Sequence, residues 1–169
     1  AAQAASDVLE SGGNAVDAAV TAAFVLAVTL PEAGNIGGGG FMLAHMDGEA
    51  AFLDFRETAP GLAERDMYLD EGGNFVQEMS LIGAKAPGIP GTVHGMKNAH
   101  AKFGSKPWAT LLKPAISLAA EGFIVPPSLA AYGQYKIAET RGKTNFADYF
   151  SGMTEGALFK QPELAATLH

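Results

Sequence analysis

A long apolar segment near the start of the sequence limits the folds that this chain can adopt. Residues 18–30 carry only two polar side chains, both threonines. A helix that spans a membrane needs about 20 apolar residues, so this run is too short and favours a buried helix. Asn14 is a good N-cap, Asp17 suits the first turn, and Pro31 ends the pattern, so we predict a helix over 15–29. Because this helix is apolar on nearly every side, other elements must cover it.

The segment after this helix predicts a β-hairpin. Residues 41–46 read as a strand, and the Asp47-Gly48 pair is typical of a two-residue hairpin turn. The return strand is expected over about 50–55, and its side chains alternate between two faces. One face carries Ala51, Leu53 and Phe55. The other face carries Phe52, Asp54 and Arg56.

The remaining sequence predicts more helices, separated by turns. A short helix fits 2–11, and longer ones fit 92–103 and about 127–140. A further helical pattern over 107–121 contains Pro114, which we expect to break it into two pieces. The segment between the hairpin and residue 92 is rich in turn residues. Strands and helices do not alternate in βαβ fashion, so the pattern indicates an α+β fold with helices packed on an antiparallel sheet.

Composition excludes several classes of protein. The sequence holds 11 Lys and Arg against 18 Asp and Glu, a net charge of −7. This balance disfavours nucleic acids and anionic membrane surfaces as partners, because both attract basic proteins. The absence of Cys excludes disulfides, thiolate metal sites and a cysteine nucleophile. With 48% hydrophobic and 17% charged residues, the chain is too apolar for intrinsic disorder.

A glycine run over 34–40 invites comparison with phosphate-binding loops. No Lys-Ser or Lys-Thr pair follows it, so it is not a Walker A motif. It also precedes a strand, whereas a dinucleotide-binding loop opens a helix. We therefore interpret the four consecutive glycines sterically, as a place where another backbone or a substrate approaches closely.

Other candidate catalytic groups give no recognisable site. The four histidines lack the spacing of metal ligands, and we assign them structural or surface roles. They are His45, His94, His100 and His169. A Ser or Thr nucleophile needs a neighbouring base or a free N-terminal amine, and neither a G-x-S-x-G motif nor an N-terminal Ser or Thr is present. We therefore predict no catalytic residue, metal or cofactor in this chain.

Arg56 is the most informative single residue. It stands at the end of a predicted strand that is rich in aromatic residues, and Glu57 follows it. The planar guanidinium is a fork of donors that matches a carboxylate. The spacing alone leaves two interpretations open: Arg56 binds a substrate carboxylate, or it pairs with a nearby acid to support the fold.

Several motifs together resemble the gamma-glutamyltranspeptidase family. They occur in the family's order and spacing over essentially the whole chain. They are 12–19 (GGNAVDAA), 34–42 (GNIGGGGFM), 55–60 (FRETAP) and 90–93 (PGTV), supported by 66–70 (DMYLD) and 111–122. The resemblance implies an N-terminal nucleophile hydrolase with a four-layer αββα sandwich, made as a precursor that cuts itself into a large and a small subunit. The new N-terminal Thr of the small subunit attacks γ-glutamyl amides, and the acyl group passes to water, an amino acid or a peptide.

The resemblance carries over to few residues of this chain. It implies that Arg56 binds the α-carboxylate of the γ-glutamyl group, with Glu57 as its supporting neighbour. Residues 1–169 then form a single partial domain, about the first half of a large subunit, without the family's first strand, its signal peptide or the Thr-bearing small subunit. The implied partners are a glutathione-like substrate and the rest of the enzyme, and the implied location is periplasmic or secreted.

Two alternatives stay open at this stage. The first is an acylase on the same scaffold, such as a cephalosporin- or glutaryl-type amidase or a capsule γ-polyglutamate processor, because Arg56 suits any substrate with a carboxylate near the scissile amide. The second is a fragment without catalysis that uses the scaffold structurally.

Overall fold

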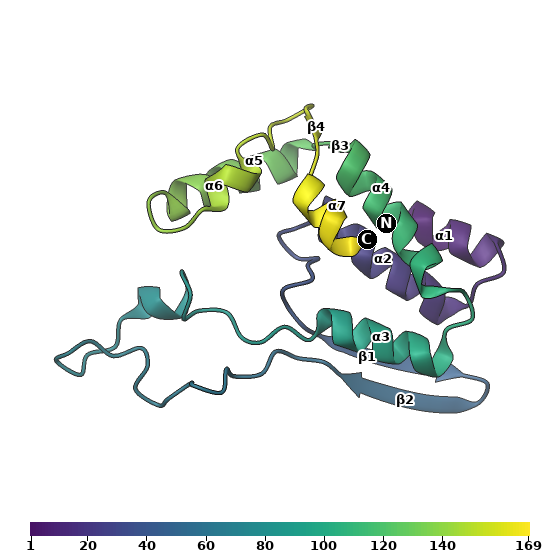
Figure 1. Ribbon diagram of the computed structural model, residues 1–169, viewed down its shortest axis with the longest axis horizontal. Helices are drawn as coiled ribbons and strands as arrows, with labels where there is room; N and C mark the ends of the chain where they lie inside the picture. The colour runs from purple at the N-terminus through teal and green to yellow at the C-terminus, as the bar shows by residue number, and fades with distance from the viewer.

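The computed structural model describes residues 1–169, and it has the α+β organisation that the sequence predicts. Figure 1 shows a helical body with a hairpin along one side, a smaller helical lobe, and a long arm that extends away from the hairpin. The elements, in chain order, are α1 (Ala2–Glu10), α2 (Ala15–Thr29), β1 (Phe41–Met46), β2 (Glu49–Asp54), the 3₁₀ helix η1 (Gln77–Ser80), α3 (Thr92–Phe103), α4 (Trp108–Glu121), β3 (Phe123–Ile124), α5 (Pro127–Thr140), α6 (Phe146–Phe150), β4 (Leu158–Phe159) and α7 (Pro162–Leu168).

Helix α2 is the centre of the body, as its apolar sequence predicts. It packs against α1, α3 and α4, and its buried side chains join a single core with those of α3, α4 and α7. Val20 and Val28 are fully buried, and Phe24 meets the ring of Trp108 edge-on at 5.5 Å between centroids. Packing on several sides supplies the cover that a helix of this composition requires.

The first turn of α2 is fixed by a capping box. The Asn14 Oδ1 atom accepts hydrogen bonds from the backbone N–H groups of Val16 and Asp17, and Asp17 Oδ2 accepts from the Asn14 N–H at 3.0 Å. Asp17 also accepts from the Ser105 N–H, the Ser105 hydroxyl at 2.6 Å and the Lys106 N–H. This buried carboxylate therefore ties the start of α2 to the loop between α3 and α4.

Strands β1 and β2 form the predicted antiparallel hairpin. Phe41 pairs with Asp54 and Met46 with Glu49, and the connecting Asp47 and Gly48 have φ angles of 52° and 83°. Such positive φ values at both central residues are what a tight hairpin turn requires. The side chains alternate as predicted: one face packs on the core, while the other leaves large apolar side chains exposed. The exposed ones are Phe41, Leu43 and Phe52.

The predicted break at Pro114 is wrong, because α4 runs unbroken through this residue. Leu111 and Leu112 are buried on one side of Pro114, and Ala115 and Ala119 on the other. All four belong to the core around α2, so packing on both sides holds the helix together across the missing N–H of the proline.

The smaller lobe and the arm complete the chain. Helices α5 and α6 share a second core with the short β3–β4 ladder. Residues 57–91 form the arm, which is turn-rich as predicted and contains only η1 and two isolated bridges. The Lys143 ammonium lies 2.9 Å from the Glu78 carboxylate and links the lobe to the arm. No helix has the length and apolar character needed to cross a membrane.

Candidate functional site

The structure places Arg56 at the end of the hairpin, two residues beyond β2, with its side chain 64% exposed. The guanidinium carbon lies 5.9 Å from the centroid of the Phe41 ring, and Nε lies 3.6 Å from a Glu57 carboxylate oxygen. The two residues predicted for the site are therefore together. The guanidinium makes no hydrogen bond within the chain, so its terminal nitrogens are free to receive a carboxylate.

The backbone around Arg56 is held by main-chain pairing. Phe55 continues the hairpin ladder by exchanging hydrogen bonds with Gly40, at 3.0 and 3.3 Å. The Arg56 N–H donates to Asp54 Oδ1 at 3.0 Å, and Thr58 pairs with Ile89 across the base of the arm. The Arg56 side chain therefore projects from a fixed backbone, although it is itself exposed.

Glycines enclose this backbone so closely that no side chain would fit. A Cβ atom added at Gly39 would lie 2.5 Å from the Phe55 carbonyl oxygen, and one at Gly88 would lie 2.9 Å from the Glu57 Cβ. A Cβ at Gly91 would overlap the Phe55 carbonyl oxygen. We call these three residues the glycine cradle. Within the glycine run, the close approach of the Phe55 backbone to Gly39 confirms the steric interpretation.

The cradle also joins three distant stretches of sequence. The N–H groups of Gly91 and Thr92 donate to the Gly38 carbonyl at 2.8 and 3.0 Å, so the glycine run contacts the start of α3. A cavity of about 260 Å³ lies beside this junction, and Phe41, Phe55 and Thr92 are among its lining residues. The site thus stands where the glycine run, the end of the hairpin and the entry to α3 meet.

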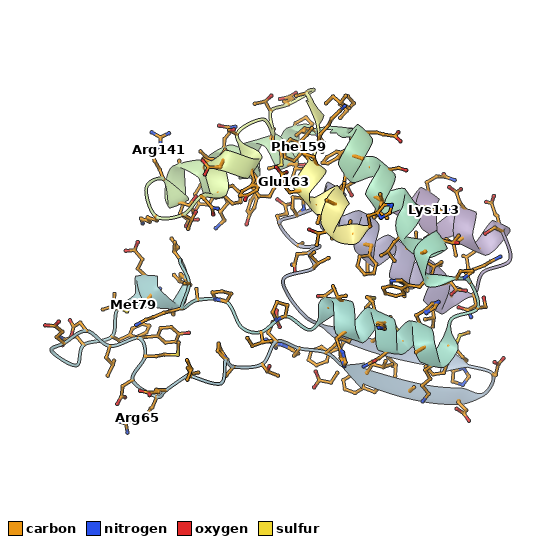
Figure 2. The ribbon with its side chains drawn as sticks, viewed as in Figure 1. Arg65, Met79, Lys113, Arg141, Phe159 and Glu163 are labelled. Carbon is orange, nitrogen blue, oxygen red and sulfur yellow. The ribbon has the colours of Figure 1, made fainter.

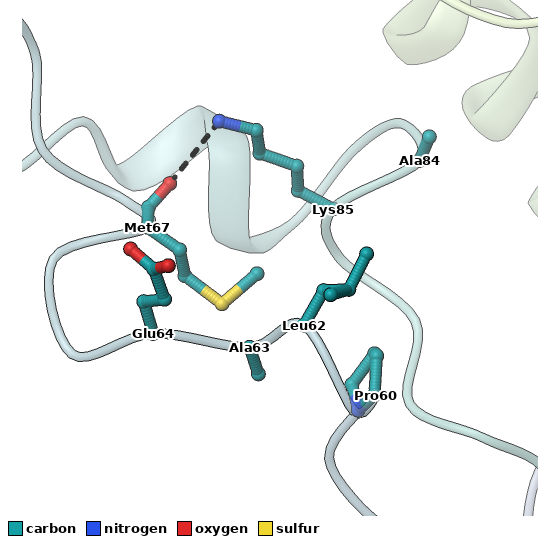
Figure 3. Close-up of a pocket in the computed structure, with 7 residues that line it drawn as sticks. All are labelled: Pro60, Leu62, Ala63, Glu64, Met67, Ala84 and Lys85. Atoms are coloured by element: carbon teal, nitrogen blue, oxygen red, sulfur yellow. Dashed lines mark hydrogen bonds between the residues drawn. The ribbon is translucent and has the colours of Figure 1, made fainter.

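A second cavity lies in the arm and does not include the site. It has a volume of about 380 Å³, and Lys85 closes one side by donating a hydrogen bond to the Met67 carbonyl at 3.3 Å (Figure 3). Its lining residues are Pro60, Leu62, Ala63, Glu64, Met67, Ala84 and Lys85. Further along the arm, Arg65 points away from the body (Figure 2) and pairs with Asp66 at 2.9 Å.

The histidines have the structural and surface placements expected from the sequence. His100 Nε2 lies 2.7 Å from the Lys106 carbonyl oxygen, and its ring meets Trp108 edge-on at 5.4 Å. The other three are exposed: His45, His94 and His169. No group of three or more His, Cys, Asp or Glu side chains is arranged to hold a metal ion.

Sequence reasoning missed the contribution of Phe41 to the site. The signal was present, because a two-residue turn at 47–48 sets the register that places Phe41 opposite Asp54. Arg56 lies two residues further on the same face, within reach of the ring. The proximity of Phe41 and Arg56 follows from the sequence only when the strand register is worked out residue by residue.

Comparisons with known proteins give a consistent result. The sequence model of the gamma-glutamyltranspeptidase family matches residues 1–169. The glutathione hydrolase proenzyme of Pseudomonas aeruginosa is 56% identical over 167 residues, which is 99% of this chain and 30% of the relative. The solved structure of gamma-glutamyltranspeptidase from Pseudomonas nitroreducens, complexed with L-DON, superposes with a TM-score of 0.95 at 56% identity, over 98% of this chain and 50% of that one.

Two other solved structures share the architecture at lower identity. The Bacillus anthracis transpeptidase CapD is 34% identical with a TM-score of 0.76, and the match covers 98% of this chain and 52% of the CapD chain. A cephalosporin acylase from Bacillus halodurans is 27% identical with a TM-score of 0.83, and the match covers 98% of this chain and 32% of the acylase chain. The acylase alternative is thus less well supported than the glutathione hydrolase assignment. The chain spans about 30% of the length of the Pseudomonas aeruginosa relative and about half of the Pseudomonas nitroreducens chain.

Proposed function

The chain belongs to the gamma-glutamyltranspeptidase family, and from this we propose that it is part of a γ-glutamyltransferase and glutathione hydrolase. Its substrates would be γ-glutamyl amides such as glutathione. The family match over the full chain, together with 56% identity to a glutathione hydrolase proenzyme, supports this assignment over an acylase of the same scaffold.

Arg56 is the substrate-binding residue that we propose for this part of the enzyme. The observation that carries the proposal is its exposed guanidinium, which is held at a fixed strand end with its terminal N–H groups unpaired. A γ-glutamyl group carries an α-carboxylate, and two parallel N–H···O bonds would bind it in one orientation. Glu57, at 3.6 Å from Nε, would hold the guanidinium while leaving that outer fork free.

The reaction itself requires residues beyond this chain. We propose that the N-terminal Thr of a small subunit attacks the γ-carbonyl carbon, with its own α-amine as the base and backbone N–H groups stabilising the oxyanion. The amine half of the substrate leaves, and water or an amino acid or peptide then takes the γ-glutamyl group from the acyl-enzyme. Arg56 would fix the acyl group at its far end, so that the γ-carbonyl lies in reach of the nucleophile.

The organisation of the protein follows from the same assignment. We propose that residues 1–169 form part of a large subunit that assembles with its remaining portion and with the Thr-bearing subunit. The relative's designation as a proenzyme supports maturation by cleavage. A periplasmic or secreted location is also proposed, on the family resemblance.

An arginine comparison tests the proposed site. In the full-length, mature protein, Arg56→Ala should reduce kcat/KM for a γ-glutamyl anilide by about 30- to 1,000-fold, as expected for the loss of a charge-assisted bidentate contact worth about 2–4 kcal/mol. Arg65→Ala is the matched control, because Arg65 is also exposed and also pairs with the acid that follows it. Equal kcat/KM values for Arg56→Ala and the wild type would overturn the role given to Arg56.

A further inference from the structure

The outer face of the hairpin provides an aromatic platform beside Arg56. Phe41 and Phe52 stack with ring centroids 5.7 Å apart and planes inclined by 18°. The Arg56 guanidinium lies over Phe41, on the same face of the hairpin. The Phe41 ring is therefore in contact with a neighbouring ring and with the cation that we propose binds substrate.

This arrangement limits the orientations available to the guanidinium. The guanidinium carbon lies over the Phe41 ring, 5.9 Å from its centroid, and the carboxylate of the next residue, Glu57, lies 3.6 Å from Nε. The ring face attracts the cation without using any of its N–H donors, unlike a carboxylate or a carbonyl. The terminal N–H groups consequently stay available while the side chain loses rotational freedom.

We propose that Phe41 is a positioning residue for Arg56, which orients the guanidinium fork toward the α-carboxylate of the γ-glutamyl group. This inference rests on the proposed function. It adds that affinity for the acyl donor depends on an aromatic ring at position 41, which touches neither the substrate nor the scissile bond. A positioning role of this kind predicts an effect on KM, because the same groups bind the ground state and the transition state.

The ring can be removed and restored in the full-length, mature protein. Phe41→Leu should raise KM for a γ-glutamyl anilide about three- to tenfold with kcat little changed, since an exposed cation–π contact and the rotational freedom of one side chain are lost. Phe41→Tyr retains the ring face and should restore the wild-type KM. Leu43→Ala is the control, because Leu43 lies on the same outer face, is 78% exposed and stands two residues beyond Phe41 along β1, away from the strand end that carries Arg56.

A double-mutant cycle separates positioning from a general structural effect. If Phe41 acts through Arg56, Phe41→Leu should change KM in the wild type and leave it unchanged in Arg56→Ala. Equal KM increases in both backgrounds, or an equal increase for Leu43→Ala, would overturn the inference. If Phe41→Leu lowers the thermal midpoint, Phe41→Met is measured in its place, and a wild-type KM there also overturns it. A wild type without turnover would instead refute the proposed function, and an active Arg56→Ala with unchanged kinetics would refute the role given to Arg56.

Discussion

Asp17 and Arg56 are both charged side chains beside the end of a regular element, yet the chain treats them in opposite ways. Asp17 is fully buried, and it accepts hydrogen bonds from the N–H groups of Asn14, Ser105 and Lys106 and from the Ser105 hydroxyl. Arg56 is largely exposed, and its guanidinium has one ion pair at 3.6 Å and an aromatic ring as neighbours. The first charge is satisfied within the chain, and the second keeps donors free.

This difference separates a charge that supports the fold from one that is available to a ligand. Burial raises the pKa of Asp17, but the hydrogen bonds from the Ser105 hydroxyl and from three backbone N–H groups outweigh it, so the pKa lies below the ordinary value for aspartate. An ionised Asp17 therefore holds α2 and the α3–α4 loop together. Arg56 contributes no comparable link between elements, and its backbone is instead held by the glycine cradle.

Removal of the Asp17 carboxylate should give the largest effect on stability. Asp17→Ala leaves the N–H groups of Asn14, Ser105 and Lys106 without their partner, and we expect a loss of about 3–4 kcal/mol in the free energy of unfolding. Chemical unfolding of the full-length protein measures this loss. Asp7→Ala is the control, since Asp7 is exposed on α1 and its carboxylate accepts a hydrogen bond only from the Gln3 side chain. Similar losses for both variants would contradict the role given to Asp17.

The same carboxylate predicts a dependence of stability on pH. Because the pKa of Asp17 is lowered in the folded state, its stabilisation is fully present above the unfolded pKa of about 4, and it is lost as pH falls through the lower folded value. The difference in unfolding free energy between the wild type and Asp17→Asn should therefore be constant above about pH 5 and shrink in acid. A difference that grows as the pH falls would show that the sign of the shift is wrong.

The glycine cradle should come next in effect. A methyl group at position 91 would overlap the Phe55 carbonyl oxygen, so Gly91→Ala must displace the backbone beside Arg56. We expect a loss of about 1–3 kcal/mol in stability, with a further decrease of kcat/KM for a γ-glutamyl anilide. Gly61→Ala serves as the control, because a Cβ at Gly61 meets no atom within 4 Å. An unchanged kcat/KM for Gly91→Ala would show that the cradle does not position Arg56.

The sequence predicts the elements that adjacent residues encode, and it does not predict the features that depend on packing between distant segments. The capped, apolar α2 and the turn at Asp47-Gly48 are encoded by adjacent residues, and the sequence predicts both correctly. The continuity of α4 through Pro114 depends on packing against α2, which no local pattern reveals.

The candidate site likewise has a part that the sequence predicts and a part that depends on long-range contacts. The motif around Arg56 and Glu57 was visible in the sequence, and the structure brings the two side chains together. The glycines at 39, 88 and 91 are visible too, but their convergence on residues 55–57 depends on backbone pairing between segments that are distant in the sequence. Sequence could also not show that Phe41 lies against the guanidinium, since that contact follows only once the strand register is applied.

Substitution of Glu57 should affect the kinetics less than substitution in the glycine cradle. Its carboxylate lies 3.6 Å from Arg56 Nε and is about one-third exposed, so solvent screens the pair. We expect Glu57→Gln to raise KM for a γ-glutamyl anilide about two- to fivefold, because the guanidinium loses one restraint but keeps the Phe41 ring. Glu64→Gln, on the exposed arm, should have no effect. A kcat that falls while KM stays constant would contradict a supporting role for Glu57.

The smallest expected change in stability is also the sharpest test of the difference between Asp17 and Arg56. Arg56→Ala should alter the free energy of unfolding by less than about 0.5 kcal/mol, because an exposed ion pair and one exposed ring contact contribute little to the folded state. The same variant should lose most of its kcat/KM, whereas Asp17→Ala should lose stability with its KM retained in the folded fraction. Unfolding and kinetic measurements on the two variants together therefore distinguish a supporting charge from a binding one. A loss above about 1 kcal/mol for Arg56→Ala would place Arg56 with Asp17, because a side chain whose donors are free for a ligand has few contacts to lose.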